Sequence, residues 1–187
     1  MSDRAIAPGE LLRGERVSLR LATLDDCTPR YEAWLADPAV NQYLETRWEP
    51  QPLAAIREFV SAMLASPDNH LFAIVESADG AHVGNIKVGP VNARHAFADM
   101  SYFIGERQCW GRGYATEAIR LATDFGFARL GLHRLQAGLY AGNVGSGRAL
   151  EKAGYRREAV FARQLKNAAG AWEDHVWYAV LREEWRS

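Results

Sequence analysis

Short stretches of alternating hydrophobic and polar residues follow longer amphipathic stretches along this chain. Alternation is typical of half-buried strands, whereas apolar residues three or four positions apart are typical of helices with one buried face. The pattern predicts helices over 53–65 and 112–130 and a short helix after Asn143. It also predicts a helix that Thr23 caps and Pro38 ends, and then a short helix or turn at 40–44. The strands that it predicts cover 16–21, 71–76, 83–91, 98–105, 133–140, 155–163 and 172–181.

These elements predict one domain over 1–187. The chain is long enough to bury a sizeable core, and no internal repeat, linker or low-complexity stretch divides it. Because helices both precede and separate the predicted strands, we expect an α/β (α+β) fold. Turn residues after 71–76 and after 155–163 predict that the strands on either side of each turn pair as antiparallel hairpins.

Composition narrows the class of protein. Hydrophobic residues make up 48% of the chain, charged residues 24%, and the formal net charge is −1, so no large basic field for nucleic acid is expected. No apolar run approaches the roughly 20 residues of a membrane helix, and no signal peptide follows Met1. The two cysteines, Cys27 and Cys109, show no metal-ligand spacing. We therefore expect a cytoplasmic protein with free thiols and neither metal, nucleic-acid nor membrane partners.

The segment 108–118, Gln-Cys-Trp-Gly-Arg-Gly-Tyr-Ala-Thr-Glu-Ala, lies between a predicted strand and a predicted helix. Glycines let the backbone approach a ligand closely, and the free N–H groups at a helix start attract anions. A phosphate-bearing ligand is therefore expected. The lysine-containing phosphate loop does not fit because Tyr114 and Ala115 follow Gly113, and the dinucleotide pattern does not fit because Thr116 stands where a third glycine is needed.

The pattern Gln-x-x-Gly-x-Gly formed by Gln108, Gly111 and Gly113 resembles the acetyl-CoA pyrophosphate loop of the GNAT superfamily of N-acetyltransferases. A second segment, 143–155, is similar to another signature of this family, in which Asn and then Ser or Ala precede a short helix ending in Glu-Lys-x-Gly-Phe or Tyr. An ordinary capped helix would explain its asparagine start and glycine stop. It would not explain why the segment follows a phosphate loop in the order of the family. The resemblance covers roughly 7–185.

The resemblance implies the GNAT fold, with a mixed, mostly antiparallel central sheet of about seven strands flanked by helices. It also implies acetyl-CoA as cosubstrate and no metal. Main-chain groups of Phe103 and Ile104 would hold the pantetheine amides. The other cofactor-binding residues that it implies are Gln108, Cys109, Trp110, Gly111, Arg112, Gly113, Tyr114, Ala115, Asn143 and Ser146.

Acetyl transfer to an amine needs a proton acceptor for the amine and a donor for the departing thiolate. Several members of the superfamily carry a glutamate base at the strand position of Asp99, so the resemblance implies Asp99 as the base, with a water bridging its shorter side chain. A strand-edge carboxylate on the solvated face is the alternative. Many members place a tyrosine donor where Leu150 stands. The ribosomal-protein N-terminal (alanine/serine) acetyltransferase branch has a serine at the position of Ser146, which implies Ser146 as the donor; helix capping is the alternative.

Two further candidates for catalytic residues have weaker support in the sequence. Cys109 near a helix start could be a nucleophile, but no histidine stands at a recognisable spacing from it. Asp174 and His175 are neighbours in a predicted strand, so their side chains should point to opposite faces and should not touch. A Trp-x-Asp-His element recurs in the ribosomal-type branch near the acceptor site, which implies a structural or substrate-shaping role for this pair.

The resemblance also implies where the amine acceptor binds. The ribosomal-type branch builds part of its acceptor cleft from the segment that corresponds to 41–48 in this chain. The residues expected to bind the acceptor are Tyr43, Glu45, Arg47, Trp48 and Asn85. Core aromatics with surface charges are the alternative for each. We expect an enzyme that acetylates a primary amine, either a protein N-terminus or a small molecule, by direct attack with both substrates bound. A non-catalytic acyl-CoA-binding or sensor protein is the alternative, and a homodimer is one oligomeric state left open.

Overall fold

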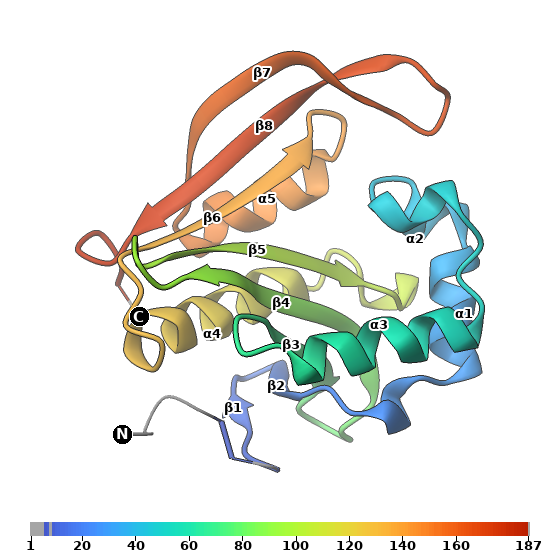
Figure 1. Ribbon diagram of the computed structural model, residues 1–187, viewed down its shortest axis with the longest axis horizontal. Helices are drawn as coiled ribbons and strands as arrows, with labels where there is room; N and C mark the ends of the chain where they lie inside the picture. The colour runs from blue at the N-terminus through green and yellow to red at the C-terminus, as the bar shows by residue number, and fades with distance from the viewer. Residues whose placement is uncertain (1–5, 8, 187) are drawn as a thin grey trace.

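The computed structural model describes residues 6–7 and 9–186. Within these residues eight strands form one sheet in the order β1-β2-β3-β4-β5-β6-β8-β7 (Figure 1). Every neighbouring pair is antiparallel except β5 and β6, which run parallel. The strands are β1 (Leu12–Arg13), β2 (Val17–Leu21), β3 (His70–Glu76), β4 (His82–Asn92), β5 (Phe97–Ile104), β6 (Arg134–Tyr140), β7 (Arg156–Lys166) and β8 (Trp172–Leu181). The mixed, mostly antiparallel sheet is confirmed; the eighth strand is the two-residue β1, which is too short for alternation to reveal.

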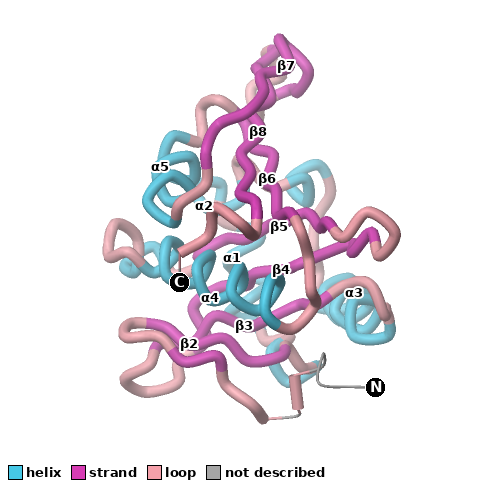
Figure 2. The backbone as a smooth tube through the Cα atoms, turned by 90° about the vertical axis from the view of Figure 1, so that its left-hand side faces the viewer, coloured by secondary structure: helices cyan, strands magenta, loops and turns pink. Residues whose placement is uncertain are grey.

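Helices cover both faces of this sheet. The helical elements are η1 (Leu24–Asp26), α1 (Pro29–Ala36), α2 (Pro38–Asn41), η2 (Glu45–Trp48), α3 (Leu53–Ala65), η3 (Arg107–Cys109), α4 (Tyr114–Ala128) and α5 (Val144–Ala153). Figure 2 shows α4 and α5 on one side of the sheet and α3 on the other, with the β7–β8 hairpin projecting beyond both layers. We call the side of α4 and α5 the helix α4 face, and the opposite side the α3 face.

The first helix begins later than the sequence predicts. Thr23 caps only the single turn η1, because the carboxylate of Asp26 turns back to accept from the Thr23 N–H and pairs with Arg20 at 2.5 Å. The α-helix starts instead at Pro29, after Thr28 accepts a hydrogen bond from the N–H of Tyr31. Proline suits the first helical position, since its missing N–H would have no partner there.

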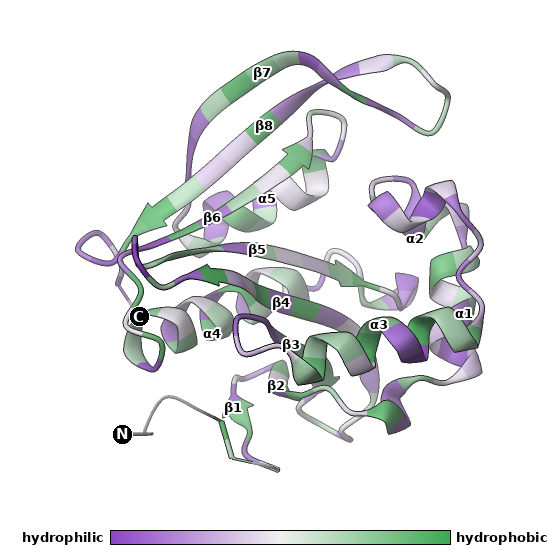
Figure 3. Cartoon of the chain, in the orientation of Figure 1, coloured by the Kyte–Doolittle hydropathy of each residue, from purple (hydrophilic) through white to green (hydrophobic). Residues whose placement is uncertain are grey.

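Apolar side chains form two clusters, one on each face of the sheet. On the helix α4 face, Phe125 and Ile119 of α4 pack with Phe72 and Ile86 of the strands, and each is at most 2% exposed. Burying a side chain of this size stabilises the fold by about 1.5–3 kcal/mol. On the α3 face, Tyr31, Trp34 and Leu35 of α1 form a smaller cluster with Ile56 and Val60 of α3. Figure 3 shows hydrophobic and hydrophilic residues mixed along the strands, β4 clearly among them, and a hydrophilic turn between α3 and β3.

No helix in the described part of the chain combines the length and the hydrophobicity that crossing a membrane requires.

Candidate active site

The sheet opens between β5 and β6. Figure 1 shows the two strands starting side by side and then diverging, so that a gap separates their C-terminal ends. Within the described residues their ladder consists of three pairs: Phe97 with Arg134, Ala98 with Leu135, and Asp99 with Gln136. Beyond Asp99 the edge of β5 that faces β6 therefore has no strand beside it, and a ligand can use its main-chain groups. We call this opening the β5–β6 gap.

The glycine-containing loop lies at the end of β5 and leads directly into α4. Gly111 and Gly113 have φ angles of 73° and 85°, in the left-handed region that favours glycine. Gly113 is the N-cap of α4, and no side chain in the described part of the chain caps it. A Cβ added at Gly111 would meet nothing within 4 Å, so the space above the loop is open. The loop therefore presents uncapped N–H groups and the positive end of the helix dipole, which suits a pyrophosphate.

The side chains of the loop divide into buried and exposed ones. Cys109 is 2% exposed, and burial raises the pKa of its thiol, which disfavours the thiolate that a nucleophile needs. The hydroxyl of Tyr114 donates to the carboxylate of Glu76, which also lies 3.8 Å from the guanidinium of Arg112. These two residues can therefore contact a ligand mainly through their main chain. Gln108, Trp110 and Arg112 are exposed, Gly113 leaves the backbone accessible, and Ala115 lies at the first turn of α4.

The main-chain hydrogen bonds of β5 contradict the expectation that Phe103 holds the pantetheine amides. Gly105 N–H donates to Val83 of β4 at 2.8 Å, and the main-chain oxygen of Phe103 lies against Gly84 of the same strand. Because successive residues of a strand direct their main-chain groups to opposite edges, Phe103 faces β4 and cannot offer these groups to the gap. Ile104 does face the gap, where its carbonyl oxygen accepts a 2.8 Å hydrogen bond from the Trp110 indole.

A pair of hydroxyl groups lies on the helix α4 face of the gap. Asn143 caps α5 by accepting from the N–H of Ser146 at 3.3 Å, which places Ser146 in the first turn of the helix. The Oγ of Ser146 lies 2.6 Å from the Oη of Tyr102, which projects from β5. Burial raises the pKa of Tyr102, so its hydroxyl stays protonated. Sequence reasoning missed Tyr102, because nothing in the motif spacing links it to a residue 44 positions away.

Asp99 lies on the α3 face, at the point where β5 and β6 begin to diverge. The side-chain amide of Gln136 donates to its carboxylate at 2.8 Å. As alternation predicts, Asp99 and the exposed Ser101 share this face, whereas Met100 and Tyr102 pack toward α4. Asp99 is partly buried, and its hydrogen bond with Gln136 joins the two strands at this point.

Lys87 of β4 lies near Asp99 on the same face. It stands opposite Ser101 in the β4–β5 ladder and is half-buried. Burial lowers the pKa of Lys87, although the charge of Asp99 opposes this effect. A carboxylate, an amide and an ammonium group therefore form a polar floor beneath the gap.

Residues from the loop after α2 meet the ends of β6 and β8 on the α3 face. The carboxylate of Glu45 accepts a 2.5 Å hydrogen bond from the Tyr140 hydroxyl and a 3.2 Å bond from the Trp48 indole. The ring of Tyr43 lies 5.9 Å from that of Tyr140. The Glu45 side chain is 70% exposed, so this acidic and aromatic cluster is open to a ligand.

Arg47 does not have the open position expected of an acceptor-binding cation. Its side chain is 4% exposed, and it donates to the Tyr140 hydroxyl at 2.7 Å, to Lys166 O at 2.6 Å and to Leu44 O at 2.8 Å. Its guanidinium also lies 4.1 Å from the centre of the Trp48 ring. These contacts tie η2 to β6 and to the β7–β8 hairpin, so Arg47 holds the cluster together rather than lining its surface.

Asn85 also lies away from the acceptor-binding side where the sequence analysis predicts it. It is 4% exposed and lies on the α3 face of β4, in the region covered by α1. Its Oδ1 accepts from the Nε2 of His82 at 3.0 Å, and no partner for its Nδ2 occurs in the described residues. The ring of Trp34 lies 5.0 Å from that of His82 and closes this region. Asn85 therefore belongs to the interior beneath α1 and does not reach the open acceptor side.

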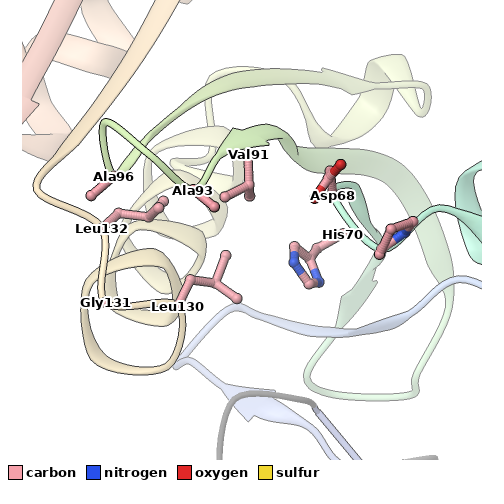
Figure 4. A pocket seen from close by; sticks show the side chains of 9 residues that line it. Asp68, His70, Val91, Ala93, Ala96, Leu130, Gly131 and Leu132 are labelled. Atoms are coloured by element: carbon pink, nitrogen blue, oxygen red, sulfur yellow. The ribbon is translucent and has the colours of Figure 1, made fainter.

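A separate hollow of about 400 Å³ lies at the opposite end of α4 from the glycine loop (Figure 4). Its walls include His70 of β3, Val91 of β4, and Leu130 and Leu132 after α4. This hollow does not contact the β5–β6 gap. Within the described residues no group of three side chains of the kind that bind metals comes together.

Comparison with known proteins identifies this architecture. A family model described as "Acetyltransferase (GNAT) domain" matches residues 16–156. The chain is 35% identical over 123 residues to the probable N-acetyltransferase YjcK of Bacillus subtilis (strain 168), a match that covers 65% of this chain and 66% of that protein. The structure of Mycobacterium smegmatis RimJ in complex with CoA-disulfide superposes with a TM-score of 0.80 at 26% identity, over 91% of this chain and 84% of that one.

Another solved structure shares the fold of this chain at a lower sequence identity. Spermidine N-acetyltransferase from Vibrio cholerae, in complex with CoA and spermine, superposes with a TM-score of 0.79 at 19% identity, over 90% of this chain and 97% of that one. This chain belongs to the GNAT acetyltransferase family.

Proposed function

We propose that this protein is an acetyl-CoA-dependent N-acetyltransferase that transfers an acetyl group to a primary amine by direct attack in a ternary complex. The observation that carries the proposal is the placement of polar groups around the β5–β6 gap. The hydroxyls of Ser146 and Tyr102 lie on one face of the sheet and the carboxylate of Asp99 on the other. A thioester held in the gap would have a donor on its leaving-group side and an acceptor on its amine side.

Acetyl-CoA would lie along the open edge of β5. Its pyrophosphate would bind the N–H groups of 109–115, and its pantetheine would meet the main chain of Tyr102 and Ile104 in place of a neighbouring strand. The Trp110 indole, which now bonds to Ile104 O, would have to release that carbonyl or share it. This placement would bring the thioester sulfur to the start of α5, beside Ser146.

The chemistry then needs few groups. The neutral amine attacks the carbonyl carbon, the C–S bond breaks, and Ser146 donates to the developing thiolate while Tyr102 holds its hydroxyl. Asp99 accepts a proton that the amine nitrogen loses, directly or through a water. No covalent intermediate is required, because holding both substrates together supplies much of the rate.

The acceptor is a primary amine that approaches from the α3 face. The exposed carboxylate of Glu45, surrounded by Tyr43, Trp48 and Tyr140, suits a cationic amine with an apolar or extended body. A protein N-terminus and a small-molecule amine both satisfy this chemistry. We also propose that the enzyme acts in the cytoplasm.

A non-catalytic acyl-CoA-binding protein is the second candidate, since the usual tyrosine position is taken by Leu150, which is fully buried. Tyr102 weakens this argument because it brings a tyrosine hydroxyl to Ser146 from a different element.

The deciding experiment mixes the protein with acetyl-CoA and follows free thiol in the presence of spermidine, benzylamine or a peptide with an N-terminal serine. Thiol release that depends on one of these amines, with the acetylated product found by mass spectrometry, supports the enzyme. Tight CoA binding by calorimetry without any turnover would favour the binding protein.

A further inference from the structure

His175 of β8 projects onto the α3 face of the sheet and lies over β6, the strand that borders the β5–β6 gap. It stands opposite Tyr140 in the β6–β8 ladder, and its ring lies over Gly138 of β6, where a Cβ would collide with Nε2. The Trp177 ring lies beside it, with centroids 5.1 Å apart. Because Gly138 lies two residues beyond Gln136, the imidazole occupies the β6 arm of the opening, further out than Asp99.

The neighbouring Asp174 does not touch His175 but shapes its surroundings. Asp174 points to the other face and accepts a 2.8 Å hydrogen bond from the N–H of Arg163 in β7. Arg163 has a φ of 52°, which is unusual for a residue with a side chain, and the β7–β8 register shifts between Phe161 and Leu165. The bulge at this point presents the next residue, Gln164, to the imidazole.

Gln164 orients the ring and decides where its proton lies. The Oε1 of Gln164 is 2.8 Å from the Nδ1 of His175. An amide oxygen only accepts, so in the neutral imidazole the proton is on Nδ1 and the lone pair is on Nε2. No protein partner for Nε2 occurs in the described residues. Burial lowers the pKa of His175, and the negative charge of Glu45 opposes this effect. Tyr140 of β6 and Phe161 of β7 complete its surroundings.

An amine that binds as ammonium must lose two protons. It loses one before attack, so that nitrogen has a free electron pair, and a second when the tetrahedral intermediate becomes an amide. In the overall reaction, one of these two protons is balanced by the proton that the CoA thiolate takes up, and the other is released to solvent. Asp99 can accept only one of them at a time, so a second acceptor on the same face would serve the reaction.

We propose that Nε2 of His175 is this second catalytic acceptor and removes the first proton from the bound ammonium group. The proton moves from nitrogen to Nε2 and gives an imidazolium, which later releases it to water. The freed electron pair then forms the C–N bond as the C–S bond breaks. Gln164 is a positioning residue, since it acts through His175, and Asp174 supports the bulge that presents it. This inference rests on the proposed acetyl transfer.

The position of the imidazole proton is tested without any substrate. Long-range ¹H–¹⁵N correlation spectra of the labelled protein, compared with those of His175→Gln, should show His175 protonated on Nδ1. Gln164→Leu, a substitution at an exposed residue, should abolish the preference for this tautomer while leaving the thermal midpoint near that of the parent. A parent protein with the proton on Nε2 would overturn the proposal.

The catalytic role is tested by pH–rate profiles with spermidine, benzylamine and the serine peptide. At neutral pH, His175→Gln should lower kcat on the order of a hundredfold, a typical effect of losing a general base. The loss should shrink as pH approaches the pKa of the amine, because free amine then needs no such base. His95→Gln, at an exposed turn residue, is the matched control and should retain the parental profile.

The outcomes separate the two proposals. An active parent whose profile is unchanged in His175→Gln would overturn the inference alone. A parent that acetylates none of the probe amines would overturn the proposed function and this inference with it.

Discussion

The Tyr102 hydroxyl lies 2.6 Å from the Oγ of Ser146 and 3.1 Å from the main-chain oxygen of the same residue. These two contacts link the middle of β5 to the first turn of α5 across the helix α4 face of the gap. When Tyr102 donates to Oγ, the serine proton is free to point at a thiolate. The pair can therefore act as one donor, which leads to a first prediction.

Ser146→Ala should lower kcat by roughly ten- to a thousandfold, the effect of removing one transition-state donor, while acetyl-CoA binding changes little. Tyr102→Phe should lower kcat by less. Because the two hydroxyls act as a unit, the double variant should be no slower than Ser146→Ala. Steady-state kinetics and calorimetry check this. Tyr155→Phe is the control, since that hydroxyl bonds Thr123 at 2.8 Å instead; equal losses in both tyrosine variants would point to general damage.

Gly113→Val should weaken acetyl-CoA binding at least tenfold. A β-branched side chain at a φ of 85° strains the loop and obstructs the approach of phosphates to the start of α4. Gly131→Val is the matched control, because Gly131 has a φ of 69° and lies beyond the other end of α4, where an added Cβ meets nothing within 4 Å. Calorimetric titration with CoA measures both. Equal affinity in the two variants would remove the loop from the binding site.

Asp99→Asn keeps the shape of the side chain and its contact with Gln136 but removes its basicity. If Asp99 takes the proton that leaves the tetrahedral intermediate, kcat should fall on the order of a hundredfold at every pH, with no recovery when free amine accumulates. The measurement is a pH–rate profile with the best amine of the panel. A variant that recovers fully at high pH would show instead that Asp99 serves the first deprotonation.

Arg47→Met should destabilise the protein by about 2–3 kcal/mol, the usual cost of losing hydrogen bonds from a buried charged group. The Glu45 cluster should loosen with it, so KM for the amine should rise several-fold while KM for acetyl-CoA stays near the parental value. Denaturant unfolding and steady-state kinetics measure the two effects. Arg94→Met, in an exposed turn, is the control; a rise in KM for acetyl-CoA alone would contradict this role.

Stability should fall as the pH drops below about 6.5, the ordinary pKa of histidine. Burial lowers the pKa of His82 and of His70, so the folded protein binds fewer protons than the unfolded chain in this range. The free energy of unfolding therefore rises with pH here, and is lost as pH falls toward the lowered pKa values. Denaturant unfolding of the parent and of His82→Gln should show a smaller pH dependence in the variant. The same slope in both would assign the effect to other groups.

Local patterns in the sequence predicted most of the elements. Helix 53–65 coincides with α3, and the alternation around Asp99 placed Asp99 and Tyr102 on opposite faces, as the structure shows. Two glycine positions in the loop were interpretable because a strand, a tight turn and a helix start leave a local signature. These features depend on residues a few positions apart, which periodicity and turn chemistry report directly.

Contacts between distant segments could not be predicted in this way. Arg47 is buried because Tyr140, 93 positions away, lies beside it, and a solvent-exposed arginine would have the same local sequence. Asn85 is enclosed by α1 for the same kind of reason. The bulge that turns Gln164 toward His175 depends on a hydrogen bond across a hairpin, so only the folded arrangement shows why Asp174 and His175 occur together.

The three-pair ladder between β5 and β6 has a consequence for how proteins with this sheet could diversify. Beyond those pairs no backbone bond in the described part of the chain joins β5 to β6, so the angle between the two arms of the sheet depends on the side chains packed beneath them. Met100, whose sulfur lies 3.8 Å from the Tyr155 hydroxyl, is one such side chain. A smaller or larger residue in its place would tilt the arms and resize the opening. Substrate range can thus drift through replacements in the interior, with every residue that touches substrate left in place.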